Sequence, residues 1–159
     1  MAAPYSGPAL DDLRKNLAEL VTAGLVPYNV AEKGGSLLEL AIVTARLTVD
    51  EDADEDERDA AYAEALVAVL KEAVTKERMP FRRYRRVLKY VLPLKEDYLG
   101  KSIEERRTAA GQELTDGKKA VKPGTIRTYY EPRARDDLAR VLVEMETEHR
   151  GESPPDSDS

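Results

Sequence analysis

Apolar residues that recur every three or four positions constrain the fold of this chain more than any other feature of its sequence. The clearest example is Leu10–Ala23, in which Leu13 and Leu17 belong to a leucine series at that spacing and Gly24 follows directly. Such a series occupies one face of an α-helix. Because similar series follow, we predict an all-α protein of about six helices in residues 1–149, as a single compact domain or as two small lobes.

Five further segments carry the helical pattern, with Pro, Gly or charged residues between them. Leu25–Gly35 contains Pro27 and a pair of glycines, which is typical of a loop. Two segments open with a Ser followed three residues later by a Glu, a capping-box pattern. We therefore predict helices over Ser36–Leu47, Glu57–Lys76, Phe81–Leu92, Ile103–Leu114 and from Pro132 or Ala134 to His149.

The segment Asp50–Asp59 holds eight carboxylates in ten residues. A calcium-binding loop that began at Asp50 would need Gly at its sixth position and Glu at its twelfth. The chain has Glu55 and Ala61 there. We therefore predict an acidic linker over residues 50–56, with its last acidic residues at the positive end of the next helix.

Composition excludes several kinds of site. The chain has no cysteine, so it has no disulfide, no thiolate metal site and no cysteine nucleophile, which fits a reducing compartment. MAAPYSGPAL lacks a cationic region followed by an apolar run, and no segment approaches the roughly 18 apolar residues of a membrane span. We expect a cytoplasmic protein with no membrane contact, and a disordered tail over residues 150–159.

Charge is divided unevenly along the chain, whose net charge is −6. Residues 1–75 hold 6 Lys and Arg against 15 Asp and Glu, whereas residues 76–107 hold 11 against 5. The basic part is densest in Phe81–Leu92, which predicts an amphipathic helix with Phe81, Tyr84 and Leu88 buried. The arginine tips should face solvent, and the candidate binding residues here are Arg82, Arg83, Arg85, Arg86 and Lys89.

This basic helix has three interpretations from sequence alone. Its cations can pair with the acidic first 75 residues or with a second copy of the chain, they can follow a phosphate backbone, or they can contact anionic lipid or another acidic partner. Pairing within the protein is the interpretation that we favour.

A second cationic stretch, Val121–Leu142, contains TIRTYYE at residues 125–131. Ile126, Tyr129 and Tyr130 are spaced i, i+3, i+4, so they should share the inner face of a short helix that Pro132 interrupts. Its outer side should then show Arg127 and Thr128, and the polar connection before it contains Lys118, Lys119 and Lys122.

The order AGQEL, turn, TIRTYYE resembles the helix-turn-helix of MerR-type regulators, whose second helix carries Thr-Ile-Arg-Tyr-Tyr-Glu. It is also similar to segments of small actinomycete regulatory and accessory proteins. The resemblance lies within residues 103–142 and implies a helix-turn-helix-like part over residues 99–149, after a bundle part over residues 10–92. It would place Arg127 and Thr128 toward a DNA groove, with Lys118, Lys119 and Lys122 at phosphates.

Catalytic patterns are missing from the sequence. The single histidine, His149, has no hydroxyl or carboxylate partner that the sequence places beside it, and there is no phosphate loop, dinucleotide fingerprint, serine elbow or metal-ligand cluster. We expect a non-catalytic regulatory or adaptor module that uses no cofactor, metal or small-molecule substrate. It should bind a protein partner, or itself as a homodimer, through Phe81–Leu92 and the C-terminal helix. The alternative is a DNA-binding transcriptional regulator that uses Arg127.

Overall fold

The computed structural model describes residues 2–115 and 119–155, and these form an all-α fold, which confirms the predicted class. Isolated bridge pairing aside, the described residues contain helices and connections only. The α-helices are α1 (Leu10–Ala23), α2 (Pro27–Lys33), α3 (Ala41–Thr44), α4 (Glu55–Ala73), α5 (Arg82–Val91), α6 (Ile103–Glu113), α7 (Pro123–Thr125) and α8 (Glu131–Arg150). Two 3₁₀ turns, η1 (Gly35–Glu39) and η2 (Glu96–Tyr98), and a π turn, η3 (Ile126–Tyr130), complete the set.

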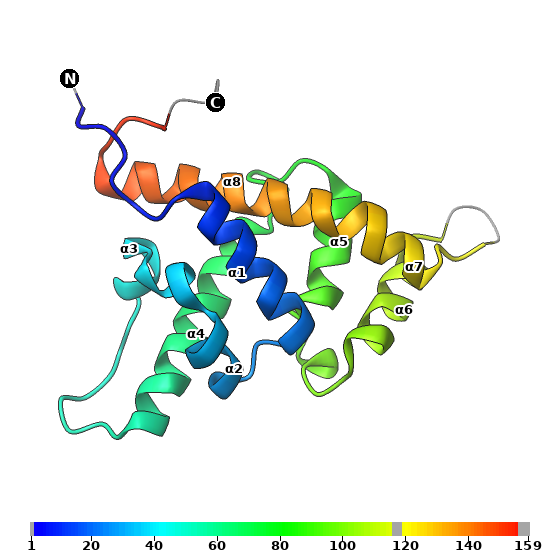
Figure 1. Cartoon of the computed structure of the whole chain (residues 1–159), viewed down its shortest axis with the longest axis horizontal. Coiled ribbons are helices and arrows are strands. Elements are labelled where there is room, and N and C mark those ends of the chain that lie inside the picture. Colours follow the sequence, from blue (N-terminus) through cyan, green and yellow to red (C-terminus); the bar gives the residue numbers. More distant parts are fainter. Residues whose placement is uncertain (1, 116–118, 156–159) are drawn as a thin grey trace.

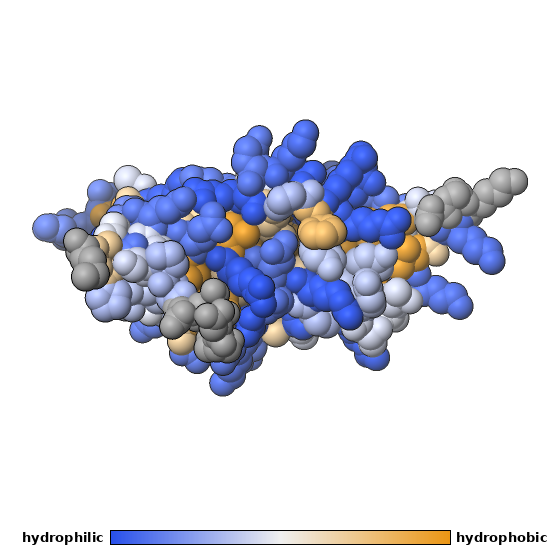
Figure 2. Space-filling model, turned by 90° about the horizontal axis from the view of Figure 1, so that it is seen from above, coloured by the Kyte–Doolittle hydropathy of each residue, from blue (hydrophilic) through white to orange (hydrophobic). Residues whose placement is uncertain are grey.

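The long helix α8 organises the molecule, since α1, α3, α4 and α5 all contact it (Figure 1). α4 packs against α2 and α3, while α5 packs against α6. One hydrophobic cluster joins buried side chains from α1 through α8. Seen from the side on which α8 lies, the surface is mostly hydrophilic with small separate hydrophobic patches (Figure 2).

The predicted first helix is confirmed with its bounds. Leu13, Leu17 and Leu20 are fully buried, and burial of each leucine side chain contributes roughly 1.5–3 kcal/mol. Gly24 ends the helix with a φ of 95°, a backbone conformation that other residues rarely adopt. Sequence periodicity is therefore sufficient where a helix buries one regular face.

The next segment departs from its prediction. Residues 27–33 form α2 instead of a loop, because Pro27 occupies the first turn, where its missing N–H costs nothing, and Val30 is buried. The capping box predicted at Ser36 is absent, since its hydroxyl donates to Oδ1 of Asn16 on α1 at 2.5 Å. The helix predicted over residues 36–47 is accordingly replaced by η1 and the short α3.

A buried carboxylate from α8 caps α3. Glu146 is fully buried and accepts hydrogen bonds from the backbone N–H groups of Ala41 at 2.7 Å and Ile42 at 3.0 Å. Nε of Arg150 donates to the same carboxylate at 2.7 Å. Glu146 thus satisfies N–H groups that a helix start leaves unpaired. Burial and then the charge of Glu146 raise the pKa of nearby Tyr5 to about 12.

The acidic linker is shorter than predicted because its end belongs to α4. Asp54 is the N-cap, and its carboxylate accepts from the backbone N–H of Glu57 at 2.8 Å. Carboxylates in this first turn are favoured by the helix dipole. The helix therefore begins at Glu55, not Glu57, and ends at Ala73, not Lys76.

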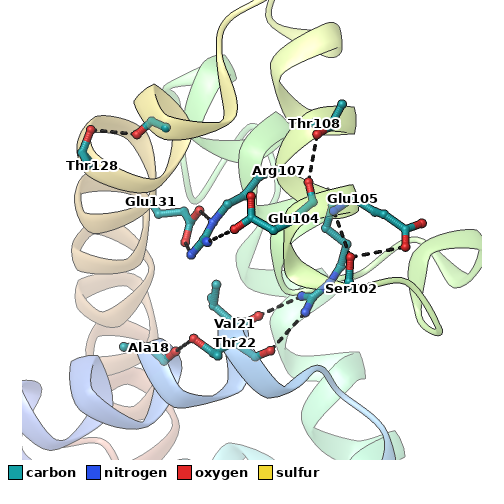
Figure 3. A network of polar contacts seen from close by, with 12 residues as sticks. Ala18, Val21, Thr22, Ser102, Glu104, Glu105, Arg107, Thr108, Thr128 and Glu131 are labelled. Carbon is teal, nitrogen blue, oxygen red and sulfur yellow. Dashed lines mark hydrogen bonds and ion pairs between the residues drawn. The ribbon is translucent and has the colours of Figure 1, made fainter.

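Two arginines of α6 are much less exposed than a surface interpretation of their sequence would suggest. Arg106 is 2% exposed and donates to backbone carbonyls of Val21 and Thr22 in the last turn of α1, and to that of Val91 at the end of α5. Arg107 lies between Glu131, at 2.6 Å, and Glu104, at 3.1 Å (Figure 3).

The capping box predicted at the start of α6 is present in part. Ser102 accepts from the backbone N–H of Glu105 at 3.2 Å, and its hydroxyl lies 3.3 Å from the Glu105 carboxylate. The helix runs over Ile103–Glu113, one residue shorter than predicted.

The helix predicted to break at Pro132 continues through it, since α7, η3 and α8 follow one another without a gap. The π turn η3 ends at Tyr130, two residues before Pro132, and Pro132 has no N–H for a regular α-type bond. α8 then extends to Arg150, one residue beyond the predicted end.

The first residues of the predicted disordered tail are ordered against the N-terminal segment. The backbone N–H of Ser153 donates to the Ala3 carbonyl at 2.7 Å, and the Ser6 hydroxyl donates to Glu152 at 2.5 Å. The prediction is therefore wrong for these residues, and residues 156–159 lie outside the described part. Among the helices described, none has the length and apolar character needed to cross a bilayer.

Candidate binding surface on α5

Four of the predicted binding residues meet on one face of α5. Arg82, Arg85, Arg86 and Lys89 are spaced i, i+3, i+4, i+7, which aligns them along the helix. Together they line one side of a hollow of about 250 Å³. Its other walls come from Tyr90, Lys95 and Glu113. We call this group of seven residues the cationic hollow.

Arg85 and Arg86 in the hollow are oriented by other residues of the chain, but neither forms a close ion pair in these contacts. Arg85 donates to the carbonyls of Met79 at 2.6 Å and Pro80 at 3.1 Å, so its guanidinium has no carboxylate in these contacts. Arg86 lies 3.7 Å from a Glu113 oxygen, a loose pair. Both sets of partners lie outside residues 1–75, so in the described residues the acidic first part of the chain does not pair with these two arginines.

Lys95 lies against the aromatic ring of Tyr90. Its ammonium lies 4.7 Å from the centroid of Tyr90 and donates to the Tyr90 hydroxyl at 3.2 Å. That hydrogen bond is the main cause that raises the pKa of Lys95. Lys95 is therefore a cation throughout the physiological pH range.

The electrostatic character of the hollow follows from its residue types. Five side chains are cationic and Glu113 alone is anionic, so an anionic group that enters meets net positive charge. Arginine binds the oxygens of carboxylates and phosphates through paired N–H groups. The hollow is thus suited to an anion.

Phe81, predicted to be buried, is 67% exposed, and this prediction is wrong. It is the N-cap of α5 and so precedes the first turn of the inner face. Its ring lies 5.3 Å from that of Tyr84, which is half-buried, whereas Leu88 is fully buried as predicted. The exposed Phe81 therefore directly precedes Arg82 in the sequence, and its ring contact is with Tyr84.

The remaining predicted residues are outside the hollow. Arg83 donates to the Tyr130 hydroxyl at 2.9 Å, which links α5 to η3. Arg127 is exposed, and Thr128 is exposed with its hydroxyl bonded to the Gly124 carbonyl at 2.8 Å. Lys119 and Lys122 are exposed, and Lys118 lies outside the described residues.

The inner face predicted for TIRTYYE is correct for Ile126 and for Tyr130, which packs against the core, and wrong for Tyr129. Ile126 is fully buried and Tyr130 is half-buried. Tyr129 is 48% exposed, and the guanidinium of Arg133 lies 3.9 Å from its ring centroid. The wider turn of the π-helix changes which positions face inward, so an i, i+3, i+4 pattern no longer predicts all of them.

Sequence reasoning missed Tyr90, Lys95 and Glu113 as parts of the hollow. Tyr90 follows Arg86 by four residues, a signal that could have placed it nearby. Lys95 and Glu113 come from the connection after α5 and from the end of α6, so only the packing of α5 on α6 brings them in. Comparisons of this chain with protein-family models, with curated proteins and with solved structures find no match.

Proposed function

We propose that this protein is a non-catalytic binding module that docks an acidic segment of a protein partner on α5. The observation that carries the proposal is the cationic hollow, in which five cations and one carboxylate surround about 250 Å³. Tyr90 contributes an aromatic side chain to its lining. Protein interfaces are enriched in arginine and aromatic residues, and both kinds are present here.

A protein partner suits this surface better than a nucleic acid for two reasons. The net charge of −6 opposes the approach of a long polyanion, whereas a short acidic segment meets mainly the local field of the hollow. The hollow is also compact, with room for a few carboxylates and not for a length of duplex. Since exposed ion pairs contribute about 0.2–1 kcal/mol each, five of them supply at most about 5 kcal/mol, and we expect a weak affinity, with a Kd of about 0.2 mM or higher.

Fluorescence anisotropy with a labelled ten-residue peptide of Asp and Glu around a central Leu tests the proposal. The double variant Arg82→Ala/Arg86→Ala should weaken binding about tenfold, because two lost contacts of about 0.7 kcal/mol each make that difference. Arg127→Ala is the matched control, since it removes an exposed cation outside the hollow. Equal affinity for the double variant and the control would contradict the proposal.

Self-association is the form of this function in which the partner is a second copy. The chain supplies its own acidic segment, Asp50–Asp59, most of which is exposed. Sedimentation velocity over a range of concentrations distinguishes this form, since a dimer that the double variant abolishes would identify the second copy as the partner.

A DNA-binding regulator is the second candidate. It is supported by the exposure of Arg127, Thr128, Lys119 and Lys122 around α7 and η3, the segment that resembles a helix-turn-helix. Titration against mixed genomic duplexes tests it. Saturable retention of a few fragments, lost in Arg127→Ala, would favour this candidate, because one good base contact is worth about 1–3 kcal/mol. Weak binding that modest salt removes would exclude it.

A further inference from the structure

A second hollow, of about 400 Å³, lies between α4, the start of α2 and the connection that follows α5. Most of its lining is apolar, and it includes Leu25, Ala60, Ala63, Val67, Leu94 and Leu99. We call it the α4 groove. It is separate from the cationic hollow, with which it shares no lining residue.

The groove exists because α4 is apolar on two faces. One face packs into the core through Leu66, Val69 and Leu70, which are fully buried. Ala60, Ala63, Glu64, Val67, Ala68 and Lys71 are spaced i, i+3, i+4, i+7, i+8, i+11 and line the groove. A surface helix normally carries polar residues on its outer face, and one that is apolar on both sides is usually covered on both.

Exposed hydrophobic side chains mark the border of the groove. Leu99, which lines it, is 38% exposed, and Tyr28, next to the lining residue Pro27, is 70% exposed. Small alanines on α4 and the exposed Leu99 line the depression. An apolar depression with exposed hydrophobic borders is typical of a site where a partner docks.

Charge around the groove identifies the partner. Glu64 and Glu96 line it, and the first turn of α4 adds Glu55, Asp56 and Glu57, against the single cation Lys71 among the lining residues. The lined part of α4, Ala60–Lys71, is about 16 Å long, or roughly three helical turns. A helix with an apolar stripe between lysines and arginines would match both the apolar floor and the acidic border.

We propose that the α4 groove docks a basic amphipathic helix of a protein partner. The partner's apolar stripe contacts the alanines and leucines of the groove, and its cations face Glu64, Glu96 and the start of α4. This site does not depend on the function proposed for α5. With both sites occupied, the protein would join an acidic segment to a basic helix.

The test uses a synthetic 14-residue helical peptide with Leu at one stripe and Lys and Arg at its flanks, titrated against the full chain. Ala60→Arg places a long cation in the groove and should weaken binding at least tenfold. Ala45→Arg is the matched control, because Ala45 is exposed and is not among the lining residues. It should bind like the unmodified chain, and circular dichroism should show the same helix content for both variants.

Three results would overturn the proposal. The first is equal affinity for the two arginine variants. The second is equal binding of a peptide with the same leucines but Glu at its flanks, which would remove the role of charge. The third is a homodimer that Ala60→Arg alone dissociates, which would make a second copy the occupant of the groove.

Discussion

Arginine pairs that look alike in the sequence have opposite surroundings in α5 and α6. Arg85 and Arg86 lie at the surface and line a hollow, while Arg106 is 2% exposed and Arg107 forms an ion pair with a Glu131 that is 2% exposed. Both helices are short and they pack on each other. The difference is in what surrounds each guanidinium, because the residue type and the dipeptide are the same.

The α6 pair shows how a buried guanidinium is accommodated. Arg106 donates to carbonyls at the C-terminal ends of α1 and α5, where the helix dipoles concentrate negative potential. Burial, and then the charge of the neighbouring Arg107, lower the pKa of Arg106. Arg107 instead has a carboxylate, and its hydrogen bond with Glu131 raises the pKa of Arg107. The α6 pair is therefore held inside the fold, whereas the α5 pair lines the cationic hollow.

Replacing Arg106 tests the comparison most strongly. Arg106→Ala should lower the free energy of unfolding by about 3 kcal/mol, since it leaves buried carbonyls of two helix ends without donors. Arg82→Ala on α5 should change it by less than about 0.5 kcal/mol. Urea unfolding followed by circular dichroism measures both. Similar losses in the free energy of unfolding for the two variants would mean that burial does not make the α6 arginine more important for stability than the α5 arginine.

Glu131→Gln tests the second arginine of α6. It keeps the shape of the side chain but removes the charge that faces Arg107, and we expect a loss of about 2 kcal/mol in the free energy of unfolding. Glu104→Gln is the control, because the Glu104 side chain is 70% exposed and should contribute less than about 0.5 kcal/mol. A larger loss in the free energy of unfolding for Glu104→Gln than for Glu131→Gln would show that Glu104 is the more important partner of Arg107.

Gly111→Ala tests how tightly the rest of α6 is enclosed. A Cβ at Gly111 would lie 2.0 Å from the carbonyl oxygen of Val121, a backbone atom of the segment that returns along α6. Overpacking of this kind costs about 1–2 kcal/mol, and thermal unfolding measures it. At Gly124, where a Cβ would meet no atom within 4 Å, the same change should be neutral or slightly stabilising. A neutral Gly111→Ala would show that this segment moves away from α6.

Tyr5 gives the smallest effect and extends the comparison to the buried carboxylate Glu146. The pKa of Tyr5 is raised from 10.0 to about 12 in the folded protein, so its favourable contribution is complete below pH 10 and is lost as pH rises through 12. Stability measured by urea unfolding should therefore fall between pH 10 and 12, and fall less in Tyr5→Phe. Equal slopes in this range would show that neither burial nor the charge of Glu146 raises the pKa of Tyr5.

Sequence reasoning predicts elements here when their evidence is local. The leucine series of α1 gives its bounds, and the apolar and basic faces of α5 identify four residues of the cationic hollow. It fails where a distant residue decides the structure. Asn16 takes the hydroxyl of Ser36 away from a capping box, and Glu146 starts α3 from more than 100 positions away.

The candidate site shows the same limit. Lys95 and Glu113 carry no signal of their own, because a lysine in a connection and a glutamate at a helix end are common surface residues. Their role depends on how α5 rests on α6. Phe81 is exposed because α5 begins one residue after it, at Arg82, so Phe81 is the N-cap and not part of the first turn.

The pairing of Ser153 with Ala3 brings the two ends of the described chain together, so the path of the backbone is almost a closed ring. When the two ends lie this close, the chain termini can be moved to another exposed position without changing the path of the backbone. A circular permutant that joins the present ends through a short Gly and Ser linker, and opens the chain in the exposed turn at Glu51 and Asp52, should keep the same helices in the same places. Its new ends would then stand beside α4, which would allow a fluorophore or a fused protein to be placed close to the groove and far along the chain from α8.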